Sequence, residues 1–385
     1  MSTRGRLGWI VLGLAAVLAV VYVFGGGEES SETIQLTAAQ RSRHGECDKT
    51  VANLDAARSA VAAMAPGGVV CLADGTYGRL ELNADKSQPG VTLRAEHPGD
   101  ATLDGAAVGG KHLTLAEFKI TSDVEVLPES TGVAIAHNRI GGGYFGVDAG
   151  PTDTVTVNDV SIVGNKFVGP FGEDAIRLNR YHDANGDGIG ALVEGNEITG
   201  VRENGNHSDC LQTVWVGDHL VFRRNYVHDN RCQGFFVKDQ ASPVHGIRVE
   251  DNLMLRDDLP CAPQAPGCGQ PSIVQIFGPY TALKFIHNTV WDGLDQVSFQ
   301  EGNSPDSVIA RNVVSRIWTS TPIEGQYRNN TRCWREATAG GSWPRKTPGE
   351  KIDCHPPFKD PAADDYRIGG GRGVDWAPSE MRFGP

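Results

Sequence analysis

The chain has 385 residues, which suits one large domain, with 48 glycines and 7% aromatic residues. This composition is typical of a protein with many turns and short strands. The formal net charge of −12 excludes general nucleic-acid binding, which needs a basic surface. A polyanion could bind only where basic side chains gather locally.

The N-terminus carries an uninterrupted apolar run over residues 8–24, with Arg4 and Arg6 before it and Glu28 and Glu29 after it. This charge asymmetry places the N-terminus in the cytoplasm and the rest of the chain outside. The run is a short membrane span or a long signal-peptide core. An A-x-A cleavage site does not follow it, which favours an uncleaved anchor over secretion. The predicted organisation is a signal anchor or signal peptide over 1–25, a flexible linker over 26–45 and an extracellular domain over 46–385 that meets the membrane only through the N-terminal segment.

All eight cysteines lie in the exported part of the chain. An even number of cysteines in an oxidising compartment favours disulfides over free thiols. The simplest arrangement pairs sequence neighbours: Cys47–Cys71, Cys210–Cys232, Cys261–Cys268 and Cys333–Cys354. Because no C-x-x-C motif is present, the sequence gives little support to a zinc or redox site.

A helix is predicted at the start of the exported domain. Residues 51–64, VANLDAARSAVAAM, have the spacing of an amphipathic helix, and the PGG that follows is a natural stop.

A short pattern then recurs along the chain: two residues, an asparagine and a mostly apolar pair. Successive copies are 18 to 36 residues apart, and each follows a short β-branched stretch such as VSIVG. The asparagines are Asn138, Asn165, Asn196, Asn225, Asn252, Asn288, Asn312 and, in a weaker copy, Asn330. Repeats of this size that carry strands indicate a β-solenoid.

A solenoid also explains why asparagine recurs. Each coil lays its strands about 4.8 Å from those of the last coil, and an asparagine at one bend of every coil can pass amide hydrogen bonds along the stack. The alternative, a β-sandwich, needs N-G or D-G hairpin turns, which are sparse here. Because an exposed strand edge must be covered, we expect the helix over 51–64 to cap the first coil and residues 334–385 to wrap the other end.

Two segments resemble a known superfamily. Residues 66–105, PGGVVCLADGTYGRLEL…GVTLRAEHPGDATLDG, are similar to the opening coil of the right-handed parallel β-helix proteins that include pectate and alginate lyases, and DDYRIGGGRGVDW (364–376) resembles their closing segment. The resemblance covers most of residues 45–385. It implies an all-β, right-handed parallel β-helix with an N-terminal capping helix and an irregular C-terminal segment. The superfamily also holds hydrolases, epimerases and non-catalytic adhesins, so the fold does not name an activity.

Polar side chains gather on three successive coils, which are GEDAIRLNR (172–180), NHSDCLQTVW (206–215) and HDNRCQGFFVKDQ (228–240). Aligning their apolar pairs places Asp174, Asp209 and Gln233 in one column, and Arg177 and Gln212 in another. Stacked aspartates repel unless a proton or cation lies between them, and hard cations prefer oxygen ligands. We therefore predict that the two aspartates are metal ligands and that Arg177, Gln212 and Gln233 bind substrate. The alternative is a solvated polar strip.

The same alignment places His207 beside Arg231, with Lys238 a few residues beyond. In the alginate- and chondroitin-lyase branch, a lysine removes a proton and an arginine one coil on assists it. Lys238, in GFFVKD, resembles that lysine, whereas Gln275 stands where the arginine is expected. The resemblance therefore implies Lys238 as the catalytic base, with Arg231 or His207 neutralising charge or donating the proton.

A loop between two of these coils matches the calcium-loop pattern D-x-[DN]-x-[DN]-G-x5-E, with Asp183, Asn185, Asp187 and Glu194 as oxygen ligands. The position two after its glycine lacks the usual bulky apolar residue. This pattern predicts a structural Ca²⁺ site, and the alternative is a polar surface turn.

Together these observations predict a monomeric extracellular enzyme that acts on an acidic polysaccharide, most directly a lyase that cleaves uronate-containing glycans by β-elimination. A C5-epimerase shares the proton-abstraction step and is one alternative. A non-catalytic glycan-binding or cell-envelope protein is the other. The G-H-G motif of polygalacturonase-type hydrolases, the Walker loop, G-x-S-x-G and H-E-x-x-H are all absent from the sequence.

Overall fold

The computed structural model describes residues 46–150, 154–202, 207–215, 217–230, 232–238, 244–255, 272–291, 296–300, 306–319, 325–337, 348–381 and 383–384. They belong to a compact unit that extends over Leu36–Pro385. The predicted N-terminal segment and linker lie outside the described residues, as do Arg231, Cys261 and Cys268. In the part of the chain that is described, no helix has the length and apolar character needed to cross a membrane.

The described chain is built from three parallel sheets, which we call sheets A, B and C. Sheet A has 12 strands in the order β1 (Lys49–Val51), β2 (Val69–Leu72), β5 (Val91–Ala95), β8 (Leu113–Ala116), β11 (Ala134–Ala136), β15 (Val160–Val163), β19 (Ala191–Glu194), β22 (Leu220–Arg223), β26 (Arg248–Glu250), β30 (Lys284–Ile286), β33 (Val308–Ala310) and β35 (Gln326–Arg328).

Sheet B consists of β3 (Gly75–Tyr77), β6 (Ala101–Leu103), β9 (Lys119–Ile120), β12 (Arg139–Gly141), β16 (Lys166–Val168), β20 (Glu197–Thr199), β23 (Tyr226–His228), β27 (Leu253–Leu255), β31 (Thr289–Trp291), β34 (Val313–Thr319), β36 (Thr331–Ala337) and β37 (Lys351–Ile352).

Sheet C consists of β4 (Leu80–Asp85), β7 (Ala106–Lys111), β10 (Val124–Val126), β13 (Val147–Ala149), β17 (Ile176–Leu178), β21 (Leu211–Thr213), β24 (Phe235–Lys238), β28 (Ser272–Phe277) and β32 (Gln296–Phe299), and it joins sheet B through β34 and β36. Two small parallel pairs lie outside these sheets, β14 (Val157–Asn158) with β18 (Tyr181–His182) and β25 (Val244–His245) with β29 (Tyr280–Thr281).

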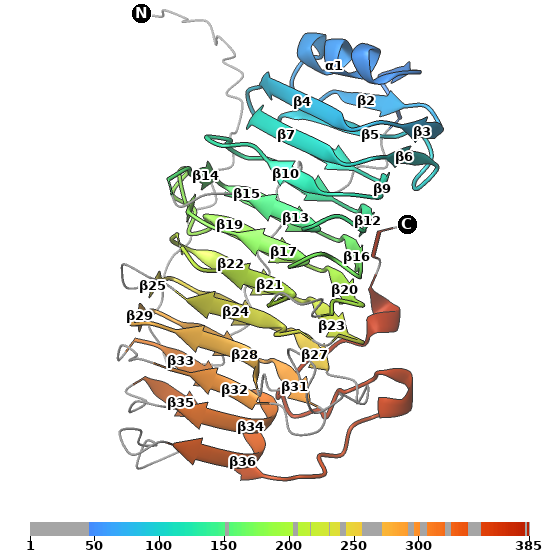
Figure 1. Cartoon of the computed structure of the whole chain (residues 1–385). Coiled ribbons are helices and arrows are strands. Elements are labelled where there is room, and N and C mark those ends of the chain that lie inside the picture. Colours follow the sequence, from blue (N-terminus) through green and yellow to red (C-terminus); the bar gives the residue numbers. More distant parts are fainter. Residues whose placement is uncertain are drawn as a thin grey trace, which may run out of the picture. The chain divides into compact units, whose positions relative to one another are not determined.

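Each coil contributes one strand to each sheet in turn, as in the path β19, β20, β21 and then β22 (Figure 1). Every strand pair in the three sheets is parallel, so residues about one coil apart in sequence become neighbours in space. Inward side chains stack as apolar columns, for example Ile176, Leu211 and Phe235 of sheet C, all fully buried. The predicted parallel β-helix is confirmed.

The asparagine ladder lies at the bend between sheets A and B, as predicted. All eight asparagines are fully buried. From Asn138 to Asn312, the backbone N–H of each donates to the side-chain Oδ1 of the next at 2.9–3.1 Å. Each side-chain amide in this series also donates to the next Oδ1 and to a carbonyl of sheet A, as Asn225 Nδ2 does to Val193 O. The ladder therefore satisfies backbone groups that the bend removes from the sheets.

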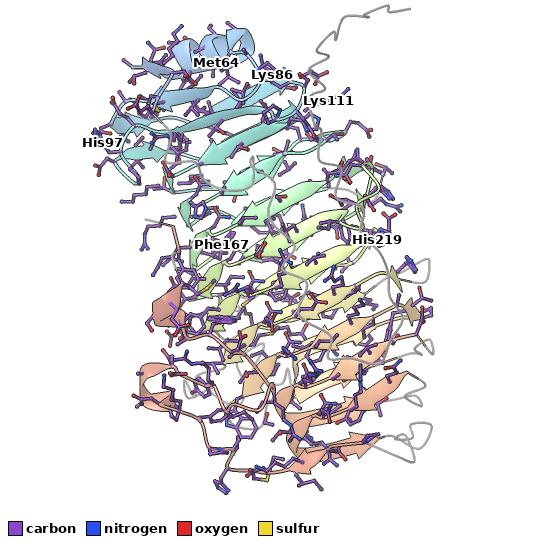
Figure 2. The ribbon with its side chains drawn as sticks, turned by 180° about the vertical axis from the view of Figure 1, so that it is seen from behind. Met64, Lys86, His97, Lys111, Phe167 and His219 are labelled. Atoms are coloured by element: carbon purple, nitrogen blue, oxygen red, sulfur yellow. A yellow bond between two sulfur atoms is a disulfide. The ribbon has the colours of Figure 1, made fainter. Side chains whose placement is uncertain are left out.

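The capping helix α1 is shorter than the sequence indicated and spans Leu54–Ala63. It begins late because Val51 pairs with Leu72 in sheet A and the Asn53 side chain caps the helix, accepting from Ala56 N at 2.8 Å. Its buried side, which includes Val61, packs on the first coils. At its C-terminal end Lys86 Nζ donates to the Met64 carbonyl at 3.0 Å, and Figure 2 shows the two residues side by side.

The C-terminal segment differs from the expectation that it wraps the last coil. Residues 331–337 and 351–352 continue the coils as β36 and β37, and the chain then runs back along sheet B (Figure 1). Val374 and Trp376 pack on outward apolar side chains of sheet B, including Leu253. The Trp376 indole N–H also donates to the Asp251 carbonyl at 2.9 Å. The segment lies here because it removes this apolar surface from water.

Three of the four predicted disulfides are present, namely Cys47–Cys71, Cys210–Cys232 and Cys333–Cys354. Each joins successive coils. The fourth predicted pair, Cys261–Cys268, lies outside the described residues.

Candidate functional site

The two predicted columns form on sheet C. The backbones of Asp209 and Gln233 pair as an isolated parallel β-bridge. The backbone N–H of Ala175, the residue after Asp174, donates to the Asp209 carbonyl. Asp174, Asp209 and Gln233 therefore occupy equivalent positions on three coils. Arg177 pairs in register with Gln212. The alignment of apolar pairs therefore predicted the register correctly, because the buried side of each strand fixes it.

Asp174 and Asp209 lie behind the surface and are both fully buried. The Asp209 N–H donates to Asp174 Oδ1 at 2.7 Å. Asp174 Oδ2 and Asp209 Oδ1 have no hydrogen-bond partner within the described chain. Burial, together with the negative charge of Asp209, raises the pKa of Asp174 to about 9. A proton on Asp174 relieves the repulsion between the acids, and a cation held by the two unpaired oxygens would do the same.

These two possibilities give opposite responses to Asp174→Asn. Without a cation, the folded protein keeps Asp174 protonated up to about pH 9, whereas the unfolded chain ionises it above about pH 4. The unfolded state then binds fewer protons, so wild-type stability falls as pH rises through this window. The asparagine amide would mimic the protonated acid, so we expect the variant to be more stable than wild type at pH 8 by about 1 kcal/mol or more.

The measurement is chemical denaturation at pH 5 and pH 8, with calcium and with a chelator, and Asp104→Asn at an exposed position is the control. If calcium stabilises the wild type and the Asp174→Asn variant loses that response, a cation rather than a proton lies between the acids.

His207 is the exposed partner of this buried pair. Its Nδ1 lies 3.2 Å from Asp209 Oδ2, and its side chain is 38% exposed whereas that of Asp209 is 0% exposed. Gln212 Nε2 donates to the same Asp209 oxygen at 2.8 Å. The His207 ring also meets Phe236 edge to face, with ring centroids 5.5 Å apart. A buried carboxylate thus orients a partly exposed imidazole, which is a side chain that can transfer protons near neutral pH.

Lys238 lies on the same face as His207 but away from the acids. It is exposed at the end of β24, two residues beyond Phe236 and therefore on the same side of the strand. Its Nζ is 5.7 Å from the centre of the Phe277 ring, which itself packs against Phe236. Five residues separate it from the column position of Gln233, or about 16 Å along the strand. His207 and Lys238 are therefore two separate polar groups joined by an aromatic surface.

Arg177 is held by partners that the sequence did not indicate. Its Nε and Nη2 donate to the two oxygens of Asp148 at 2.9 and 2.6 Å, and its guanidinium lies 3.9 Å from the centre of the Phe145 ring. Asp148 pairs with Arg177 in sheet C, one coil before it. Extending the alignment of apolar pairs by one coil, to FGVDAG, would have found both partners.

The other predicted substrate ligands differ in exposure. Gln212 is partly exposed, whereas Gln233 is buried and donates through Nε2 to Gln275 Oε1. Arg231 lies outside the described residues. The face of sheet C formed by Arg177, His207, Gln212, Phe236 and Lys238 is therefore the candidate site, and we call it the sheet C face.

The predicted calcium loop folds as a series of tight turns. Asp183 accepts backbone N–H groups from Gly186, Asp187 and Gly188, with the Gly188 bond at 2.8 Å. The Glu194 carboxylate pairs with Arg223 on the neighbouring strand of sheet A at 3.0 Å. Calcium binding would require the Glu194 carboxylate to leave Arg223 and bind the ion, because the last glutamate of a calcium loop is one of the ligands. The calcium site stays a prediction.

Comparisons with known proteins concern the fold. No protein-family model matches the chain, and no curated protein matches it. Among solved structures, a mannuronic-acid-specific polysaccharide family 6 lyase from human gut microbiota is 14% identical, covering 79% of this chain and 82% of that one, with a TM-score of 0.40. A PL6 alginate lyase in complex with a trisaccharide is 11% identical, covering 88% and 94%, with a TM-score of 0.44. The A-module of the Azotobacter vinelandii mannuronan C-5 epimerase is 14% identical, covering 78% and 93%, with a TM-score of 0.43. The assignment as a parallel β-helix rests on the strand pairing of the chain itself.

Proposed function

We propose that the protein is a lyase that acts on a uronate-containing polysaccharide and that the sheet C face is its active site. The observation that supports this most is the pair formed by the buried Asp209 and the exposed His207. A partly exposed imidazole that a buried carboxylate orients, on a face that also carries Lys238, suits proton transfer on an anionic substrate.

In the proposed reaction His207 is the base. With Nδ1 donating to Asp209, its Nε2 accepts the proton from C5 of the uronate. The C5–H electrons form the C4–C5 double bond, the C4–O4 bond breaks, and O4 leaves with a proton supplied from the protein or from water. Lys238, further along the same face, attracts the carboxylates of neighbouring uronate units and so holds the anionic chain on the sheet C face.

This assignment changes the role that the lyase resemblance implied for Lys238. Histidine titrates near neutrality, and here a carboxylate orients it. Asp174 and Asp209 then act as positioning residues, because both are too buried to touch a polysaccharide.

We further propose that the protein works outside the cytoplasm. Disulfides persist in oxidising compartments, and three are present in the described chain. Residues 1–25 would provide export as an anchor or signal peptide.

The test is incubation of the purified protein with alginate, pectate, glucuronan and glycosaminoglycans, with and without calcium. A lyase produces the ultraviolet absorbance of unsaturated uronate ends together with shorter chains. If the chain length is unchanged and the uronate stereochemistry is altered, the protein is a C5-epimerase rather than a lyase. Retention of the glycan without turnover would replace it by a binding protein, and no response to any acidic glycan would remove the proposal.

A further inference from the structure

A separate group of metal-binding side chains lies near the N-terminal end of the coils, away from the sheet C face. Asp74 follows β2, and Glu96 and His97 follow β5. One ligand atom from each of the three lies within 4.8 Å of the other two. Within the described residues, no other group of three histidine, cysteine or acidic side chains meets this condition. Figure 2 shows His97 at the margin of the first coils.

The parallel register builds this group. Cys71 pairs with Arg94 in sheet A, so Asp74 and His97, each three residues further on, leave adjacent strands at equivalent positions. His97 Nδ1 lies 2.9 and 3.1 Å from the two Asp74 oxygens. The Cys47–Cys71 disulfide ties the same strand to the chain before the helix. The three donor atoms are thus brought together because their residues follow two strands that pair in register.

The charge of the group favours a cation. Among the described residues, neither Asp74 nor Glu96 forms an ion pair with a lysine or arginine, and His97 is the basic partner that Asp74 has. The pKa of the nearby Tyr77 is raised, first by burial and then by the negative charges of Asp74 and Glu96. Their negative charge is therefore only partly balanced at this corner of the protein.

We propose that Asp74, Glu96 and His97 bind a divalent transition-metal ion of the zinc type. One imidazole nitrogen and two carboxylate oxygens are ligands that zinc accepts in proteins, and the exposed position leaves room for water as a further ligand. The ion would join the turn after β2 to the turn after β5. Its role is to fasten the first coils, independently of any activity at the sheet C face.

The test is a titration of the full chain with zinc chloride, followed by calorimetry, in parallel with thermal unfolding. Wild type should bind one equivalent that His97→Gln and Asp74→Asn lose, and zinc should raise the unfolding temperature of the wild type alone. All three positions are outside the buried core, so the variants should fold as wild type does in the presence of a chelator.

His182→Gln is the matched control. His182 is also exposed and pairs with one aspartate, Asp218, at 2.9 Å, but it does not belong to a three-ligand group in the described chain. Its zinc equivalent should match that of the wild type. Failure of the wild type to bind zinc, or equal loss in the His97→Gln and His182→Gln variants, would overturn the proposal.

Discussion

Replacement of Asn225 by alanine is expected to lower the free energy of unfolding by about 3–5 kcal/mol. Asn225 Oδ1 accepts both the backbone and the side-chain N–H of Asn196 at 3.0 Å, and its Nδ2 donates to Val193 O and Asn252 Oδ1 at 3.0 Å. Alanine would leave donors and an acceptor unpaired in a fully buried bend. Each buried polar group left without a partner costs about 1–3 kcal/mol.

The effect is measured by chemical denaturation followed by circular dichroism. Asn83→Ala is the matched control, because Asn83 is an exposed asparagine on β4, and its replacement should change stability by no more than about 0.5 kcal/mol. If Asn225→Ala costs no more than Asn83→Ala, the ladder does not hold the coils together and the repeated asparagine has another cause.

The ladder was predictable because one local requirement recurs in every coil. The chain must turn sharply between sheets A and B, and the residue before the asparagine adopts positive φ, as at Gly164 (64°), Gly195 (63°) and Arg224 (53°). Glycine at two of these positions, in VGNKF and EGNEI, is a visible mark of that bend. Spacing, β-branched strands and asparagine thus point to the same structure, and the fold follows from them.

The path of the C-terminal segment was not predictable in the same way. Sequence periodicity gives the repeats but does not say which outer face carries apolar side chains that need covering. In the sequence, Leu253 and Leu255 look like ordinary strand residues. Val374 and Trp376 pack on them because both leucine side chains point outward from sheet B. The N-terminal capping helix, by contrast, depends on a few adjacent residues and was predicted. It starts later than predicted because Val51 pairs with Leu72 in sheet A.

In the candidate site, the sequence predicted columns better than partners. The apolar pairs fixed which residues stack, so Asp174, Asp209 and Gln233 align. Competition for side chains depends on the whole three-dimensional surroundings. For that reason the sequence did not indicate that Glu194 pairs with Arg223. Asp148, the partner of Arg177, was missed because the alignment ended one coil too early.

If the proposed lyase activity is found, His207→Gln should lower kcat by about 10²–10⁴-fold with a much smaller change in KM, because glutamine keeps polar character but cannot exchange a proton as imidazole does. Asp209→Asn should also lower kcat and should alter the pH profile, since the amide no longer carries the charge that pairs with Nδ1 of His207. The measurement is the initial rate of unsaturated-end formation across pH.

Two variants make this result interpretable. His182→Gln, at an exposed His–Asp pair outside the sheet C face, should retain wild-type activity.

Lys238→Ala separates the two assignments of the base. In the proposed mechanism Lys238 attracts the substrate carboxylate, so its loss should raise KM more than it lowers kcat, and added salt should weaken binding to the wild type more than to this variant. If Lys238→Ala loses kcat and His207→Gln keeps it in full, Lys238 rather than His207 is the base. The contact of His207 with Asp209 would then be structural, because proton transfer cannot depend on a residue whose removal leaves the chemical step unchanged.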